Sequence, residues 1–442
     1  MIDGSDRRIE WDKYFNAVEE SKTIRPEGRI TKVVGLIAEG DGMGLGIGSL
    51  CAIRNDFNRE IRAEVIGFRD DKVLLMPYGD LRGISPGSRI IPLEDTPSVA
   101  VGDAFLGRVI DGMGDPLDGK GRIAFTQKYP LYGSPINPME RKTIKEPLDV
   151  GISAINTMIP LGRGQRVAIM AGSGVGKSVL MGMMTKHTTA DVIILGLIGE
   201  RGREVKDFVS DTLGPEGMER SVVVAATSDS PPLVRIRGAY LATTMAEYFR
   251  DQGKNVLLIM DSITRYAMSS RDVGLAAGEP PTSRGYTPSF FVKIPVLLER
   301  AGYVEGSGSI TGIYTVLVEG DDMNDPVGDT VRSIVDGHIV LSRDLANKGH
   351  YPAIDVLASV SRVMRDVSQA EHMKLRSKAV DVIAAYRGAE DMISIGAYVD
   401  GSDARIDEAK RLMPKIEAFL RQDMHRRVSI EMGLGELRRI FS

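Results

Sequence analysis

The chain has 442 residues, about three times the roughly 150 residues of a typical domain, which predicts two or three domains. Hydrophobic residues make up 43%, and 56 basic against 60 acidic side chains leave a net charge of −4; this excludes a disordered chain and disfavours a protein held on nucleic acid by bulk positive charge. The single cysteine, Cys51, excludes a disulfide scaffold and fits a reducing compartment.

No segment has the pattern of a membrane anchor or a signal peptide. The best apolar runs, Val192–Ile198 and Val256–Met260, are far shorter than the roughly 20 residues that a spanning helix needs. The first residues, Met1–Asp6, are polar and acidic, without the basic start and apolar stretch of a signal peptide. Both observations predict a soluble, cytoplasmic protein.

Residues 1–22 contain one short amphipathic pattern. Trp11, Tyr14, Phe15 and Val18 recur at the i, i+3, i+4, i+7 spacing of a helix. This helix either packs on its own protein or docks a partner, and the presence of the only tryptophan favours docking slightly.

Residues 23–95 read as a small β-barrel or β-sandwich. Short apolar stretches at Ile30–Ile37, Ile61–Phe68 and Val73–Met76 are separated by Gly, Asp and Pro turns. The glycine-rich segment Gly40–Gly48 resembles a phosphate loop in composition, but no strand and helix flank it, which favours turns within the β domain.

Residues 96–365 change to an alternation of strand-like and helical patterns, which predicts an α/β domain with a mainly parallel sheet. A turn cluster at Asp111–Gly119 predicts hairpins at its entrance. The expected strands are Val167–Met170, Val192–Ile198, Val222–Ala226, Val256–Met260 and Ile310–Val318.

Residues 366–442 are helical by pattern. Their clearest amphipathic stripe contains a proline, Pro414, that we expect to bend the helix. The stripe comprises Ile406, Leu412, Ile416, Phe419 and Leu420.

A Walker A phosphate loop lies at 171–178, with alanine in place of the first glycine. A strand at 166–170 enters the loop and a helical run at 178–187 leaves it, so backbone N–H groups and the helix N-terminus converge on phosphate. Lys177 is placed to reach the β- and γ-phosphates and Ser178 to ligand Mg²⁺. The other interpretation is a glycine-rich turn with a solvated lysine. The candidate nucleotide-binding residues are Ala171, Gly172, Ser173, Gly174, Val175, Gly176, Lys177, Ser178 and Val179.

Two carboxylates follow other predicted strands. Asp261 ends the strand 255–261 and suits the Walker B acid that holds the Mg²⁺ shell, although it could also cap a helix. Glu200 follows the strand-like run Asp191–Gly199 and is a candidate to polarise the attacking water, or else belongs to a surface Glu–Arg cluster. Parallel strands end at one edge of a sheet, so both acids are expected near the phosphate loop.

Arg362 is a candidate to stabilise the charge that gathers on the γ-phosphoryl group. It lies far along the chain from the phosphate loop, which a finger supplied across a subunit boundary would explain. A surface salt bridge explains the residue equally well.

Taken together, the chain resembles the F1/V-type rotary ATPase superfamily from about residue 25 to its end, and within it the type III protein-export ATPases, with the flagellar branch preferred over the virulence injectisome. The strings that carry the resemblance are Gly-Gln-Arg-Val-Ala-Ile at 164–169, the Walker A loop, Gly-Glu-Arg-Gly-Arg-Glu at 199–204, Met-Asp-Ser-Ile-Thr-Arg-Tyr-Ala-Met at 260–268, Gly-Glu-Pro-Pro-Thr-Ser-Arg-Gly-Tyr at 278–286 and Gly-His-Tyr-Pro-Ala-Ile-Asp at 349–355.

The resemblance implies roles for individual residues. Glu200 matches the carboxylate that activates water, and Arg201 an arginine that senses the γ-phosphate side. Asp261 matches the Walker B acid and Arg265 another arginine near the phosphates. ATP and Mg²⁺ are the implied cofactors.

Two further roles concern adenine and the neighbouring subunit. Tyr351 matches the aromatic that stacks on adenine, or else is a core tyrosine before Pro352. Arg362 matches a trans arginine finger. Because Glu200 and Arg362 occur in one chain, a ring of identical subunits can complete every site, which favours a homohexamer.

The resemblance also implies partners. They are a regulatory, stator-like protein at the N-terminal helix, a stalk-like protein in the pore near Gly278–Ser289 (with Arg284 and Tyr286 as candidate contacts), and export chaperones with their substrates. The ring would associate peripherally with a membrane export gate on the inner face of the cytoplasmic membrane. The basic stretch Arg421–Arg439 is read as a solvated helix face, or as a contact with chaperones or lipid. No specific nucleic-acid partner is expected.

The sequence therefore predicts four parts: a docking helix at 1–22, a β-barrel at 23–95, a P-loop ATPase domain at 96–365 and a helical domain at 366–442. The function that the resemblance implies is ATP hydrolysis by a homohexameric ring that energises flagellar protein export, releasing export substrates from chaperones and unfolding them at a membrane export gate. The alternatives are a virulence secretion ATPase, an F1- or V-type catalytic subunit, a Rho-like RNA-dependent ATPase and a regulatory subunit without turnover.

Overall fold

The computed structural model describes Trp11, Tyr14 and residues 27–42, 44–55, 57–125, 127–318 and 325–442. The chain divides into two compact units, Met1–Pro97 and Ser98–Ser442. The predicted docking helix at 1–22 lies outside the described residues, except for Trp11 and Tyr14. These two residues have a helical backbone and exposed side chains, and their ring centroids lie 6.2 Å apart.

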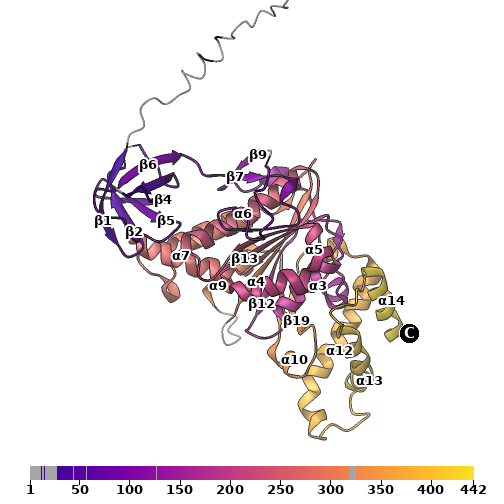
Figure 1. Cartoon of the computed structure of the whole chain (residues 1–442). Coiled ribbons are helices and arrows are strands. Elements are labelled where there is room, and N and C mark those ends of the chain that lie inside the picture. The colour runs from indigo at the N-terminus through magenta and orange to yellow at the C-terminus, as the bar shows by residue number, and fades with distance from the viewer. Residues whose placement is uncertain are drawn as a thin grey trace, which may run out of the picture. The chain divides into compact units, whose positions relative to one another are not determined.

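The first unit contains a closed barrel of six antiparallel strands in the order β1-β2-β5-β4-β3-β6, which confirms the predicted β-barrel (Figure 1). Its core is apolar and includes the fully buried Cys51. The described part of Gly40–Gly48 connects β2 to β3. The strands are β1 (Gly28–Val34), β2 (Ile37–Gly40), β3 (Leu50–Arg54), β4 (Glu60–Arg69), β5 (Lys72–Pro77) and β6 (Arg89–Glu94).

The apolar stretch expected at 30–37 forms parts of two strands. Gly35 has φ +58°, a left-handed conformation that glycine adopts without steric cost. The chain reverses there, and Val34 pairs with Ile37 across the turn.

The second unit is built on a nine-stranded sheet in the order β19-β18-β12-β17-β15-β13-β14-β8, with β16 paired to β17. Only the pairs β18–β19 and β16–β17 are antiparallel, so the prediction of a mainly parallel sheet is confirmed. The central strands are apolar throughout because both faces are covered. The strands are β8 (Arg108–Asp111), β12 (Arg166–Ala171), β13 (Val192–Ile198), β14 (Ser221–Ala226), β15 (Asn255–Asp261), β16 (Gly302–Tyr303), β17 (Ser309–Leu317), β18 (Gly337–Leu341) and β19 (Ile354–Ser361).

Strands β8, β18 and β19 were not among the strands expected from the sequence. The turn cluster at Asp111–Gly119 does form a hairpin, in which the Asp111 carboxylate accepts hydrogen bonds from the backbone N–H groups of Met113 and Asp115, both at 2.8 Å. The four residues before this turn pair in parallel with β14 and extend the sheet. A four-residue strand is too short to show a periodicity of its own.

Helices cover both faces of this sheet (Figure 1). Helix α6 packs closely on it: a Cβ added at Gly196 of β13 would lie 3.1 Å from Ala242 of α6. Apolar side chains of α3 belong to the core on the other face. The helices are α2 (Ser153–Met158), α3 (Lys177–His187), α4 (Gly202–Asp207), the π-helical η3 (Phe208–Leu213), α5 (Gly214–Glu219), α6 (Pro232–Asp251), α7 (Ile263–Ala277), α8 (Pro288–Leu298), α9 (Pro326–Ile334), α10 (Arg343–Asn347) and α11 (Met364–Val367), with 3-10 turns η1 (Asp103–Phe105), η2 (Pro138–Glu140) and η4 (Ser283–Gly285).

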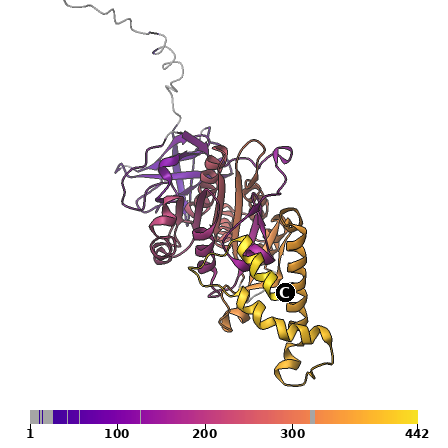
Figure 2. The ribbon, with the colours of Figure 1, turned by 90° about the vertical axis from the view of Figure 1, so that its right-hand side faces the viewer.

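The predicted C-terminal helical domain is confirmed as α12 (Ala370–Ser394), α13 (Ala404–Leu420) and α14 (Ile430–Phe441). Figure 2 shows these helices gathered at the C-terminal end of the second unit. Their apolar faces join the core cluster of the sheet, and Pro414 lies inside α13 without ending it. Two short two-stranded sheets complete the unit: β7 (Ser98–Val101) with β9 (Gln127–Pro130), and β10 (Pro147–Leu148) with β11 (Leu161–Gly162). In the described part of the chain no helix is long and apolar enough to cross a membrane.

A buried ion pair holds α6 to the segment that follows α8. The Arg300 side chain is fully buried and donates to Glu247 (2.8 and 2.5 Å), to the Thr244 hydroxyl (2.8 Å) and to the Leu131 carbonyl (2.9 Å). The guanidinium therefore has its charge balanced only while Glu247 is present.

We expect Glu247→Ala to lower the unfolding free energy by about 3–5 kcal/mol, because it leaves a buried cation unpaired. The control is Asp400→Ala, which breaks the exposed pair between Lys410 and Asp400 (2.6 Å) and is expected to cost less than about 1 kcal/mol. Denaturant or thermal unfolding of both variants measures the difference. Equal destabilisation would show that Arg300 does not depend on its carboxylate.

Candidate functional site

The loop between β12 and α3 has the backbone of a phosphate cradle. Gly174 and Gly176 have φ +78° and +92°, which non-glycine side chains rarely adopt. Gly176 is the N-cap of α3, so the helix starts at Lys177, within one residue of the expected boundary. Helix N–H groups and the positive end of the helix dipole thus lie at the loop, where they favour an anion.

Lys177, Asp261 and Glu200 come together at the carboxyl edge of the sheet. The Lys177 ammonium forms a short ion pair with Asp261 at the end of β15, and lies 3.5 Å from Glu200 Oε1. Glu200 follows β13, whose Leu197 is the register partner of Asp261. Adjacent parallel strands therefore deliver two carboxylates to one cation, as the strand order requires.

The carboxylate of Glu200 has a strongly altered proton affinity. Burial raises its pKa to about 7, and the nearby Asp261 charge raises it as well, whereas Lys177 lowers it. The side chain is 16% exposed, and its backbone carbonyl accepts a hydrogen bond from Ser228 at 2.9 Å. A carboxyl group with a pKa near neutrality is suited to accept a proton from water.

Thr315 is a site residue that the sequence analysis did not single out. Its hydroxyl donates to Asp261 Oδ1 at 2.5 Å from the neighbouring strand β17. Thr315 is fully buried within a strand that the sequence predicted. A polar side chain inside such an apolar strand was the signal that could have identified it as a site residue.

The two arginines beside Glu200 are held differently. Arg265, in the first turn of α7, packs its aliphatic stem against Gly199, where an added Cβ would lie 2.8 Å from Arg265 Cβ. Its Nε is buried without a hydrogen-bond partner, which is a costly arrangement unless an anion binds nearby. The Arg201 side chain is 81% exposed and lies 3.5 Å from Glu204 instead of at the Lys177 cluster.

Tyr351 lies beside the phosphate loop although it is 175 residues away from Gly176 in the sequence. A Cβ added at Gly176 would lie 3.4 Å from two carbons of the Tyr351 ring. Tyr351 is 46% exposed, and its backbone carbonyl accepts a hydrogen bond from the backbone N–H of Gln422 at 3.0 Å. This differs from the interpretation of Tyr351 as a core residue.

Arg362 lies at the opposite end of the strands of the same sheet, far from the end where the phosphate loop lies. The phosphate loop follows Ala171, which is level with Leu341 of β18 and hence with Ile354 of β19. Strand β19 runs back from there to Ser361, seven residues or roughly 23 Å away at about 3.3 Å per residue. The Arg362 side chain is exposed at that far edge, remote from the phosphate loop of its own chain.

The two candidate contact residues of the segment Gly278–Ser289 have different environments. Arg284 is half exposed and forms an ion pair with Asp325 at 3.2 Å. Tyr286 is 6% exposed, and its ring packs beside Phe290, so the side chain belongs to the core.

Comparison with known proteins matches three family models along the chain. They are the β-barrel domain of the ATP synthase alpha/beta family (residues 30–94), the nucleotide-binding domain of that family (residues 151–361) and the T3SS EscN ATPase C-terminal domain (residues 368–439).

Curated relatives are similar over nearly the whole chain. The flagellum-specific ATP synthase of Pseudomonas aeruginosa is 51% identical, covering 98% of this chain and 96% of the relative, and that of Salmonella typhimurium is 48% identical, covering 95% and 94%. The type 3 secretion system ATPase of Xanthomonas euvesicatoria is 47% identical, covering 90% of each chain.

Solved structures agree with these relatives. The assembled ATPase EscN from the type III secretion system of enteropathogenic E. coli superimposes with a TM-score of 0.90 at 44% identity, covering 94% of this chain and 100% of that one. EscN in complex with its central stalk EscO gives a TM-score of 0.87 at 43% identity, with the same coverage.

We expect Lys177→Met to raise the pKa of Glu200 above its value of about 7, because the substitution removes the cation that lowers it. The pKa is measured from the side-chain carboxyl signals of ¹³C-glutamate-labelled protein, with Glu200→Gln identifying the resonance. Lys186→Met, at the other end of α3, is the control and should leave the titration unchanged. An unshifted Glu200 in Lys177→Met would contradict the electrostatic contact.

Proposed function

Because the chain belongs to the family of flagellum-specific ATP synthases and type 3 secretion system ATPases, we propose that it is a Mg²⁺-dependent ATPase that energises flagellar protein export as a ring of identical subunits. The flagellar assignment is supported by the Pseudomonas relative, which is 51% identical over 98% of the chain, against 47% over 90% for the Xanthomonas secretion ATPase. Other flagellum-specific relatives, at 42% to 45% identity, are less similar than that secretion ATPase. The virulence secretion ATPase remains the alternative.

Nucleotide binding would rest on the phosphate loop. The loop glycines and the N-terminus of α3 hold the phosphate oxygens, and Lys177 exchanges a carboxylate contact for the β- and γ-phosphates. Tyr351, exposed beside Gly176, offers its ring to the adenine.

The donor set fits Mg²⁺, which prefers oxygen ligands and is usually held by one or two protein groups together with phosphates. The Ser178 hydroxyl and the Asp261 carboxylate are the residues that would hold it, and Thr315 orients Asp261. When bound, Mg²⁺ neutralises charge on the phosphate oxygens.

Hydrolysis would be an in-line attack of water on the γ-phosphorus. Glu200 orients that water and accepts its proton, a role supported by its raised pKa. A role of Arg265 near the phosphates is supported by its buried Nε, which has no hydrogen-bond partner. The exposed Arg201 side chain would turn towards the γ-phosphate. Both would balance the developing negative charge.

The observation that carries the assembly proposal is the placement of Glu200 and Arg362 at opposite edges of one sheet. Arg362 is too far from its own phosphate loop to contact a nucleotide bound there. A neighbouring subunit that presents the Arg362 edge to the loop edge completes the site, and repetition of this head-to-tail contact closes a ring. We propose a homohexamer.

The partners follow from the relatives. The EscN structure with its central stalk EscO supports a stalk-like partner in the pore, where Arg284 of the 278–289 segment is the exposed candidate contact. We further propose a regulatory partner at residues 1–22, export chaperones with their substrates, and a membrane export gate to which the ring attaches peripherally in the cytoplasm.

We expect Glu200→Gln to reduce ATP turnover by about a hundredfold or more, because glutamine cannot accept the proton of the attacking water. ATP affinity should change by roughly twofold at most, since the amide still contacts Lys177. Steady-state ATPase assays and equilibrium binding of a fluorescent ATP analogue measure the two quantities. Unchanged turnover would show that Glu200 is not the group that accepts the proton, whereas a lack of turnover in the unmodified chain itself would assign the chain to a regulatory role.

A mixture of Lys177→Ala and Arg362→Ala chains should hydrolyse ATP although each variant alone is inactive. About one interface in four of a random ring then pairs an intact phosphate loop with an intact finger. Specific activity of the unmodified chain should likewise rise with protein concentration. If mixed rings form and stay inactive, the finger does not act in trans, and an F1- or V-type subunit that needs a different partner chain becomes the better interpretation.

A further inference from the structure

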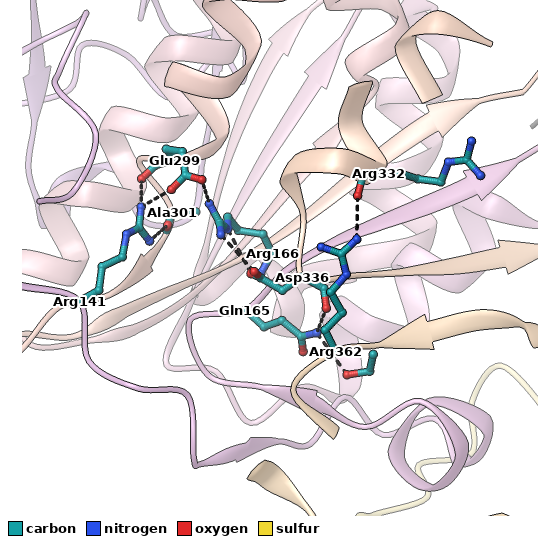
Figure 3. Close-up of polar contacts among 9 residues, drawn as sticks. Arg141, Gln165, Arg166, Glu299, Ala301, Arg332, Asp336 and Arg362 are labelled. Atoms are coloured by element: carbon teal, nitrogen blue, oxygen red, sulfur yellow. Dashed lines mark hydrogen bonds and ion pairs between the residues drawn. The ribbon is translucent and has the colours of Figure 1, made fainter. Parts of the chain in front are cut away.

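The side chain of Gln165 joins the end of β19, just before Arg362, to Asp336, which precedes β18 (Figure 3). Gln165 is fully buried at the start of β12. Its Nε2 donates to the Asp336 carbonyl at 3.1 Å and to the Ser361 hydroxyl at 3.2 Å, and its Oε1 accepts from the Gly162 N–H at 2.9 Å. Both N–H donors and the carbonyl oxygen of the amide are thus in use.

These contacts converge on the backbone of Arg362. The Arg362 N–H donates at 2.9 Å to the same Asp336 carbonyl that Gln165 binds. Ser361 immediately precedes Arg362, and its hydroxyl donates in turn to the Pro160 carbonyl at 2.8 Å. Gln165 therefore holds Ser361, the residue before Arg362, and also the Asp336 carbonyl that accepts the hydrogen bond of the Arg362 backbone N–H.

The Asp336 end of this clamp is itself immobilised. The Asp336 carboxylate accepts from Arg166 Nε and Nη2, both at 3.1 Å, and from the Arg166 backbone N–H at 3.0 Å. Arg166 also forms a short ion pair with Glu299. At Gly337 a Cβ would lie 2.5 Å from the Val360 carbonyl oxygen, so the two strands approach as closely as their backbones allow.

The guanidinium group of Arg362, by contrast, is lightly held. It donates to the Arg332 carbonyl at 3.4 Å, near the limit of a hydrogen bond, and the side chain is exposed. The base of the side chain is fixed while its charged end can move. That combination suits a group that must reach a phosphate on another chain.

We propose that Gln165 is a positioning residue for the trans arginine finger: its amide sets where the backbone of Arg362 is presented to the neighbouring subunit. This inference rests on the proposed role of Arg362. Strand β12 begins at Arg166, directly after Gln165, and ends at the phosphate loop, so one strand joins the loop of a subunit to the finger that it offers its neighbour.

The test is Gln165→Met, which keeps the side-chain volume and removes all three hydrogen bonds. We expect kcat to fall about tenfold with KM unchanged, because a finger displaced by a fraction of an ångström stabilises the transition state poorly. We also expect rescue on mixing with Lys177→Ala chains, which supply a well-placed finger to the intact loop of Gln165→Met. Mixing with Arg362→Ala chains should give no rescue.

Thr311→Val is the matched control. The Thr311 hydroxyl accepts from the Gly164 N–H at 2.9 Å, so the substitution also orphans one buried backbone N–H at the start of β12, but it touches no residue of the Arg362 segment. We expect it to lower stability as Gln165→Met does, with kcat close to that of the unmodified chain. If Gln165→Met does not fold, Ser361→Ala replaces it. This variant removes the hydrogen bonds of the Ser361 hydroxyl to Gln165 and to Pro160, and leaves the other two contacts of the Gln165 amide in place.

The outcomes separate this inference from the function on which it rests. Suppose first that the mixture of Arg362→Ala and Lys177→Ala chains is active, so that the trans finger stands. Gln165 then does not position the finger if Gln165→Met, or Ser361→Ala in its place, is fully active alone. The same conclusion holds if that variant is defective and Lys177→Ala chains do not rescue it. If the Arg362→Ala and Lys177→Ala pair is itself inactive, the proposed finger fails, and this inference with it.

Discussion

The contact of Lys177 with Asp261 and Glu200 is the interaction on which the site depends. Two carboxylates at the ends of adjacent strands repel one another, and partial burial makes the repulsion costly. The Lys177 ammonium, ion-paired to Asp261 and 3.5 Å from Glu200, offsets that cost. It does so from the first residue of α3, where the glycine-rich loop needs a cation for phosphate. One side chain therefore stabilises both acids at the place where the proposed function needs a cation for phosphate. Burial and the Asp261 charge still raise the pKa of Glu200 to about 7, against the lowering effect of Lys177.

The direction of the strands determines what one subunit lacks. Because β12, β13 and β15 are parallel, their carboxyl ends bring the phosphate loop, Glu200 and Asp261 to one edge. The antiparallel strand β19 carries the chain back and leaves Arg362 at the other edge. The same topology that assembles the site thus separates it from its candidate finger, and in the proposed head-to-tail ring a neighbouring chain would restore the pair.

Most of the fold was predictable from the sequence because its signals are local. The barrel turns, the strand-like runs and the helical C-terminal pattern each lie within a few residues, and the phosphate loop lies between a strand and a helix. Strands β18 and β19, of five and eight residues, were not among the expected strands. The other exceptions were too short or too deep to show a pattern. Strand β8 has four residues; Gly35 splits one apolar stretch into two strands; and Thr315 reads as an ordinary strand residue until β15 is placed beside it.

The sequence alone identified the candidates for binding phosphate, holding a cation and activating water, since motif spacing along one strand–loop–helix unit already constrains their geometry. Only the tertiary structure decided which of them meet. Tyr351 lies against Gly176, Tyr286 is buried in the core, and Gln165 grips the segment of Arg362, because in each case the contact joins residues brought together by strand order or helix packing. Contacts of that kind depend on how β-strands pair and helices pack across the whole unit, and no local pattern encodes them.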